Sequence, residues 1–144
     1  MTVLLDARTS QNASYGNTIS IPLPANTPVV IGQVGLNVTG AGENIRVQFS
    51  AIAELSFPEI PPFDSVIAFS IVRDAEVSPV AYALYSVSVS EANPNAVQVV
   101  TINASDFNVP LPASNLLIYN LYLFCTAEAT RIGIESFNAS AYSD

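Results

Sequence analysis

The stretch IRVQFSAIAEL at residues 45–55 alternates apolar and polar side chains along its length. Every second residue from Ile45 onward is apolar, and the residues between them are polar except for Ile52. A β-strand points successive side chains to opposite faces of its sheet. The stretch therefore predicts a strand with one face in a core and the other face in water.

Eight further segments, on both sides of this stretch, have the length and the apolar pattern of β-strands. They are residues 3–7, 18–21, 29–38, 65–73, 80–89, 97–102, 116–127 and 130–137. Proline, glycine and asparagine fill the intervals between them, and proline marks strand ends or edges because it cannot donate a hydrogen bond to a sheet. No interval shows the 3.6-residue period of a helix that could carry a parallel crossover. We therefore predict an all-β, antiparallel β-sandwich of jelly-roll type with eight or nine strands.

Two segments, residues 65–73 and 116–124, are apolar on both faces. One face of a strand in an antiparallel sandwich ordinarily meets water, so these strands are either central and covered or in contact with another subunit. We favour the subunit contact, because tyrosine and asparagine keep polar groups at the rim of an interface. The predicted interface residues are Val3, Leu4, Leu5, Phe69, Ile71, Ile118, Tyr119, Asn120, Tyr122 and Phe124.

The first sixteen residues combine a short apolar strand with a polar stretch at residues 9–16. A strand on a flexible tether could pair with the open sheet edge of a neighbouring subunit. The alternative is a first strand of the chain's own sheet. We therefore divide the chain into an N-terminal strand and possible exchange arm at residues 1–16 and a single jelly-roll domain at residues 17–144.

The composition restricts the partners of the chain. It contains no lysine, histidine or tryptophan, and its positive charge rests on Arg8, Arg46, Arg73 and Arg131. The net charge of −8 and the scattered arginines argue against nucleic acid and anionic membranes, which bind clustered basic residues. Charged residues make up 11% of the chain and apolar residues 50%. Because so little charge cannot cover the surface, we predict that the chain associates with copies of itself.

The chain lacks the side chains that most catalytic and metal-binding sites use. Without histidine and lysine, a Ser-His-Asp triad, a histidine metal site and Schiff-base chemistry are excluded. The single cysteine, Cys125, lies in an apolar run and is expected to be buried. A glycosidase needs only two carboxylates, but nothing in the sequence places two of them together. The acidic turn at residues 73–76 could bind calcium, but it lacks the residue spacing of a known calcium-binding loop. Candidate carboxylates at strand ends and loops are Glu54, Glu59, Asp64, Asp74, Glu76 and Asp106. We predict no enzyme activity, no cofactor and no metal.

The N-terminus has no basic region followed by a long apolar run, so no signal peptide is expected. No stretch approaches the roughly 20 apolar residues of a membrane span. We therefore expect no membrane partner, and either synthesis in a cytoplasm or a targeting segment that was removed ahead of residue 1.

Three stretches, residues 45–52, 68–74 and 135–142, carry a resemblance to a known family. Their alternation around an Arg-Asp turn resembles the small spore-surface jelly-roll proteins of endospore-forming bacteria, in particular the exosporium protein C type. It resembles the globular heads of collagen-like exosporium glycoproteins more distantly, and the chain lacks their Gly-x-y stalk. The resemblance implies a structural component of the outer spore layers, without enzymatic activity, that is made in the mother-cell cytoplasm.

The first functional hypothesis is thus a structural protein that assembles as a trimer or fibre on a spore or particle surface. Its partners would be copies of itself and other spore-surface proteins. One alternative is a glycan- or protein-binding module that uses Tyr82, Tyr85, Tyr119 and Tyr122 as platforms. Another is a viral capsid or fibre-head subunit, which shares the fold and the lack of a signal peptide.

Overall fold

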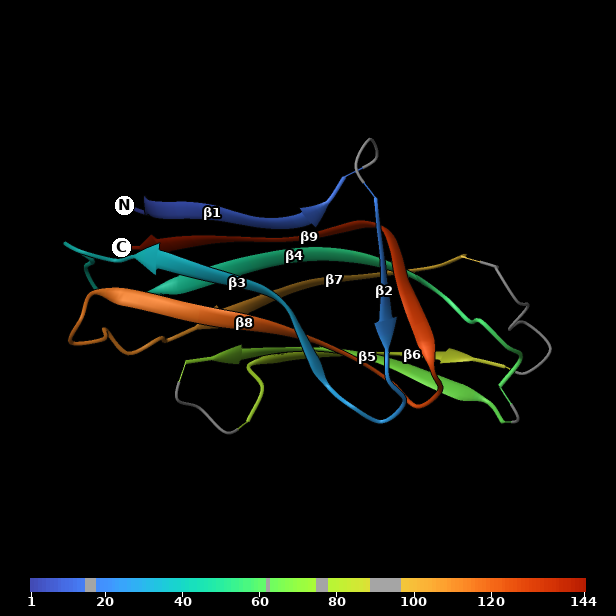
Figure 1. The fold of residues 1–144 in the computed structure, drawn as a ribbon. Coiled ribbons are helices and arrows are strands. Elements are labelled where there is room, and N and C mark those ends of the chain that lie inside the picture. Colours follow the sequence, from blue (N-terminus) through green and yellow to red (C-terminus); the bar gives the residue numbers. More distant parts are fainter. Residues whose placement is uncertain (15–17, 62, 75–77, 89–96) are drawn as a thin grey trace.

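The computed structural model describes residues 1–14, 18–61, 63–74, 78–88 and 97–144. In these residues nine strands form two antiparallel sheets that pack face to face (Figure 1). The first sheet has the order β1-β9-β4-β7, with β2 also paired to β9, and the second has the order β3-β8-β5-β6. The strands are β1 (Val3–Ala13), β2 (Ile19–Leu23), β3 (Val29–Asn37), β4 (Arg46–Ser56), β5 (Ser65–Arg73), β6 (Ala81–Val87), β7 (Val97–Phe107), β8 (Leu116–Cys125) and β9 (Ala129–Ser143). The prediction of a jelly-roll sandwich is confirmed.

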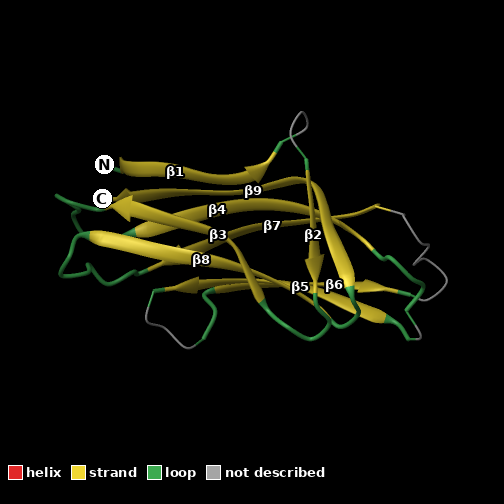
Figure 2. Cartoon of the chain, in the orientation of Figure 1, coloured by secondary structure: helices red, strands yellow, loops and turns green. Residues whose placement is uncertain are grey.

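Figure 2 shows strands joined by loops throughout the described ranges. No helix long and apolar enough to cross a membrane occurs among these residues. All nine predicted segments are strands, and β1, β7 and β9 extend several residues beyond the predicted C-terminal ends.

Of the two alternatives for the N-terminal residues, residues 9–13 follow the strand of the chain's own sheet and not the flexible tether, since they continue β1 and pair with β9. Their side chains are polar because they meet water and neighbouring strands: the Thr9 hydroxyl donates to the Asn138 side chain over 2.7 Å. The Asn12 amide donates to Glu135 over 2.7 Å, and Ala13 is buried. The predicted boundary between residues 16 and 17 lies outside the described residues.

Strands β1 and β2 lie one after the other along the same edge of β9. β1 pairs with Glu135 to Ser143, and β2 pairs with Ala129 to Gly133. The pairing of β9 with β4 shifts register at this junction, where β9 bends (Figure 1). Gly133 has a φ of 71°, and a Cβ atom there would collide with the Glu54 carboxylate. Glycine is required for this bend because its φ is one that other residues rarely adopt.

The core fills the space between the two sheets. The alternation of β4 is confirmed, since its apolar residues from Val47 to Leu55 are buried at every second position. The Phe49 ring lies edge-on to Tyr119 of the opposite sheet, with 4.8 Å between ring centroids, and stacks on Phe137 at 6.0 Å. Edge-on and offset ring pairs of this kind add to the stabilisation from burial alone.

Candidate assembly surfaces

The outer face of the β3-β8-β5-β6 sheet carries apolar side chains from all four strands and no charged group. In register, Val30, Tyr122, Ser70 and Tyr82 form one row across the sheet. The only charged residue in the four strands is Arg73, whose guanidinium bonds Asp106 of the other sheet. We call this surface the uncharged face. Its residues are Val30, Gln33, Gly35, Asn37, Val66, Ala68, Ser70, Val72, Tyr82, Leu84, Ser86, Leu116, Ile118, Asn120, Tyr122 and Phe124.

Large apolar side chains of the uncharged face are open to solvent. Leu84 is 59% exposed, Tyr82 58% and Val30 49%. An apolar patch of this kind on a single chain marks a contact with another molecule more often than chance exposure does.

Four predicted interface residues, Ile118, Asn120, Tyr122 and Phe124, lie along β8 in the middle of the uncharged face and are half-buried. The Asn120 side chain accepts a hydrogen bond from Gln33 over 2.9 Å. They stay predicted contact residues.

Three other predicted interface residues, Phe69, Ile71 and Tyr119, are 0% exposed and belong to the core. The prediction that they contact another subunit is wrong. In a strand that is apolar on both sides, the sequence pattern cannot tell the inner set from the outer set. The register of β5 and β8 turns these three side chains toward the first sheet.

The N-terminal candidates differ in exposure. Val3 and Leu4 are 51% and 54% exposed, whereas Leu5 is half-buried and packs against the core. β1 pairs with β9 of the same chain. A role of these three residues in contacts, and exchange of the strand between copies, stay predictions.

Side chains from one sheet occupy backbone groups at the edge of the other sheet. The Tyr85 hydroxyl of β6 donates to the Thr101 carbonyl of β7 and accepts from the Thr101 N–H over 3.1 Å. On the opposite side of the sandwich, the Asn37 N–H of β3 donates to the Asp6 carboxylate over 2.8 Å. This bond is the main reason why the pKa of Asp6 is lowered. At these positions an incoming strand would have to displace a side chain before it could pair.

Replacing Tyr85 with phenylalanine is expected to lower the free energy of unfolding by about 1 kcal/mol, because both Thr101 backbone groups lose their partner. Urea unfolding followed by circular dichroism measures the change. Tyr82→Phe is the matched control, because the Tyr82 side chain points to the uncharged face. Equal stability of the two variants would contradict the bond.

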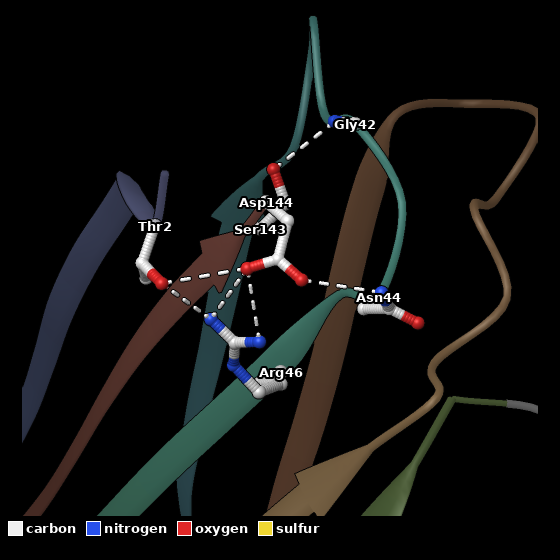
Figure 3. A network of polar contacts seen from close by, with 6 residues as sticks. All are labelled: Thr2, Gly42, Asn44, Arg46, Ser143 and Asp144. Carbon is white, nitrogen blue, oxygen red and sulfur yellow. Dashed lines mark hydrogen bonds and ion pairs between the residues drawn. The ribbon is translucent and has the colours of Figure 1, made fainter.

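The two ends of the chain are tied together at one end of the sandwich, as Figure 3 shows. The Asp144 carboxylate accepts from both terminal nitrogens of Arg46 at 3.2 Å and from the Asn44 amide at 3.1 Å. Arg46 also donates to the Thr2 hydroxyl over 3.1 Å. The Asn44 bond, followed by Arg46, lowers the pKa of Asp144. Because these groups are exposed, their ion pair and hydrogen bonds add little to the free energy of unfolding. Their main effect is to hold the start of β1 in place.

A half-buried polar bridge joins the two sheets. Asp106 of β7 accepts from Arg73 of β5 over 3.0 Å and from the Tyr119 hydroxyl of β8 over 2.9 Å. Burial, reinforced by the Asp106 charge, raises the pKa of Tyr119.

Cys125 is buried and unpaired, as predicted, and burial raises the pKa of its thiol, which disfavours the reactive thiolate.

A second buried pair lies at the bend of β9. Arg131 and Glu135 are 7% and 1% exposed, and Arg131 Nε donates to Glu135 Oε2 over 3.0 Å. Sequence reasoning missed this pair. Residues four apart in a regular strand are about 13 Å apart, and only the bulge around Gly133 brings them together.

Within residues 1–14, 18–61, 63–74, 78–88 and 97–144, no three acidic or cysteine side chains lie close enough to hold a metal ion. Residues 75 and 76 of the acidic turn at residues 73–76, and with them Glu76, lie outside these ranges. Of the tyrosines proposed as ligand platforms, Tyr119 is in the core and Tyr85 bonds Thr101, while Tyr82 and Tyr122 share the uncharged face.

No protein-family model and no curated protein sequence matches the chain. Its fold is similar to part of dimeric latent PorU from Porphyromonas gingivalis, with a TM-score of 0.52 and 14% identity. It is also similar to part of VP2 in the infectious bursal disease virus subviral particle, with a TM-score of 0.51 and 7% identity. Each alignment covers 96% of this chain, but only 13% of the PorU chain and 37% of the VP2 chain. At these identities the likeness shows the fold alone.

Proposed function

We propose that the chain is a non-enzymatic structural subunit that assembles with copies of itself, and that the uncharged face is one of its contacts. The observation that carries the proposal is a four-stranded sheet whose outer surface is free of charge and mostly apolar, with large apolar side chains open to solvent. A face of this kind can be buried without removing a charged group from water, which is the most expensive part of forming an interface.

The occupant of the uncharged face is a second copy of the chain. Copies with a net charge of −8 repel one another at long range, so a stable contact needs a surface that adds no further like charge. Four strands about 4.8 Å apart and about 30 Å long give a flat area of about 570 Å², before side-chain relief is counted. With that relief, the face approaches the roughly 800 Å² that each partner buries in a standard interface.

A shell is the form of assembly that we propose. The likeness of fold to VP2, whose structure is that of a subviral particle, supports a capsid-type subunit. The spore surface, which follows from the family resemblance of residues 45–52, 68–74 and 135–142, is the second setting. In both settings the subunit would be made in a cytoplasm and end on the surface of a particle.

Replacing Leu84 with glutamate is expected to weaken self-association by about a hundredfold, because a carboxylate would have to be buried in the contact. Leu84 is 59% exposed, so the substitution should leave the fold intact. Sedimentation velocity and negative-stain electron microscopy of the purified full chain measure the assembly, and circular dichroism checks the fold.

The matched control is Val97→Glu, which puts the same charge on an apolar, 50% exposed residue of the other sheet. Wild-type association should also strengthen as salt rises from about 0.01 M to about 0.15 M, because screening shortens the range of repulsion from about 30 Å to about 8 Å. A wild-type chain that stays monomeric at high concentration contradicts the proposal. So does equal disruption by both substitutions.

A further inference from the structure

The outer face of the first sheet carries a polar trough, on the side of the molecule opposite the uncharged face. Two adjacent rows of mostly small, uncharged polar residues run across β1, β9, β4 and β7 in register: Ala7, Ser140, Gln48 and Ser105, then Thr9, Asn138, Ser50 and Asn103. Residues from both rows line a hollow of about 460 Å³, which is within the range of small-molecule sites.

Several hydrogen-bond donors and acceptors of the trough have no partner among the described residues. The Asn138 amide accepts from Thr9 over 2.7 Å and donates to Ser50 over 3.4 Å, which leaves one N–H and one lone pair. The Gln48 and Asn103 side chains are exposed and make no side-chain hydrogen bond to any described residue. Amide and hydroxyl groups that can both donate and accept are therefore present on all four strands, at a strand spacing of about 4.8 Å that is comparable with the length of one pyranose ring.

Aromatic rings border the trough. The next row across the sheet is Leu4, Tyr142, Arg46 and Phe107, in which Arg46 is paired with Asp144 and Phe107 is 68% exposed. An exposed ring beside a row of amides and hydroxyls offers a flat apolar surface for the C–H face of a sugar.

The electrostatics favour a neutral ligand. No carboxylate lines the hollow, and its one cationic residue, Arg8, is paired with Asp6 at 3.1 Å. An anionic chain would approach against the net charge of −8. The lining combines amide and hydroxyl groups with the apolar residues Ala7, Phe49 and Ala139, a mixture that suits a ligand with both hydroxyl groups and C–H faces.

From these contacts we infer that the trough binds a neutral oligosaccharide lying across the four strands, with Gln48, Asn138 and Asn103 bonding its hydroxyls and Phe107 packing against a ring. This is a second, binding role on the face that assembly through the uncharged face leaves open. It does not depend on that assembly.

The test is saturation-transfer-difference NMR and isothermal titration calorimetry on the full chain, because both methods tolerate large assemblies. The probes are cellohexaose, N-acetylated chitohexaose, xylohexaose, mannohexaose and maltohexaose at millimolar concentration, with a hexagalacturonate as the anionic comparison. At least one neutral hexamer is expected to bind, and more tightly than the hexagalacturonate.

Gln48→Ala combined with Asn103→Ala is expected to weaken binding at least about tenfold, since two direct hydrogen bonds are lost. Phe107→Ala is expected to weaken it about fivefold. Gln33→Ala, an exposed amide on the uncharged face, is the control and should leave affinity unchanged. Absence of binding by every neutral hexamer overturns the inference. Tighter binding of the hexagalacturonate, or equal loss in the Gln33→Ala control, overturns it as well.

Discussion

Replacing Arg131 with methionine is expected to lower the free energy of unfolding by about 3–5 kcal/mol, because Glu135 would remain in the core without its cation. Glu135 is 1% exposed and has two side-chain partners in the structure, Arg131 and Asn12. The Asn12 amide alone cannot balance a buried negative charge. Urea unfolding of the full chain, followed by circular dichroism, measures the change.

The double variant Arg131→Met with Glu135→Leu is the control. It removes both charges, so most of the lost stability should return, as happens when a buried ion pair is exchanged for apolar groups of similar volume. Asn12 keeps its bond to the Ile31 carbonyl in this variant. A single Arg131→Met variant that unfolds at nearly the wild-type urea concentration would show that the pair does not hold the bend of β9.

Removing the Asp106 carboxylate with Asp106→Ala is expected to destabilise the fold by about 2–4 kcal/mol, since a buried hydroxyl and a partly buried guanidinium both lose their acceptor. The Tyr119 hydroxyl belongs to a side chain that is 0% exposed, so water cannot replace the carboxylate without entering the core. The same unfolding measurement applies.

A double-mutant cycle separates this bridge from general effects of the substitution. Tyr119→Phe should be more destabilising in the wild-type background than in the Asp106→Ala background, because the bond from the hydroxyl to Asp106 is already missing there. Glu59→Ala, which removes an exposed carboxylate between β4 and β5, is the control for loss of charge alone. Additive effects of Tyr119→Phe and Asp106→Ala would argue against the bond between them.

The strands could be predicted from the sequence because their signal is local. The alternation at residues 45–55 and the prolines between segments place all nine strands, with the errors at the ends. The largest errors fall on the strand ends at residues 9–13 and 138–143, where both faces carry mostly Ser, Thr, Asn or Ala. Hydrogen bonds to neighbouring strands hold these ends in the sheet, and those neighbours are far away in the sequence.

The surfaces could be predicted only in part. The sequence indicates that β5 and β8 are apolar on both sides, but it does not reveal which set of residues points outward. In the structure, the uncharged face contains Ile118, Tyr122 and Phe124, whereas the core contains Tyr119, Phe69 and Ile71. The polar trough gave no signal at all, because its residues come from four strands that are separate in the chain.

By itself the sequence determined that this protein is an antiparallel sandwich with little surface charge and without the histidine or lysine that most catalytic sites need. Period-two alternation and composition are properties of neighbouring residues and of their totals, so they can be read without a structure. Only the tertiary structure decided which apolar side chains face outward, which strand edges are closed by side chains, and where Arg131 meets Glu135 and Arg73 meets Asp106. Those outcomes depend on strand order, register and a bulge at Gly133, which are set by packing between segments distant in the chain.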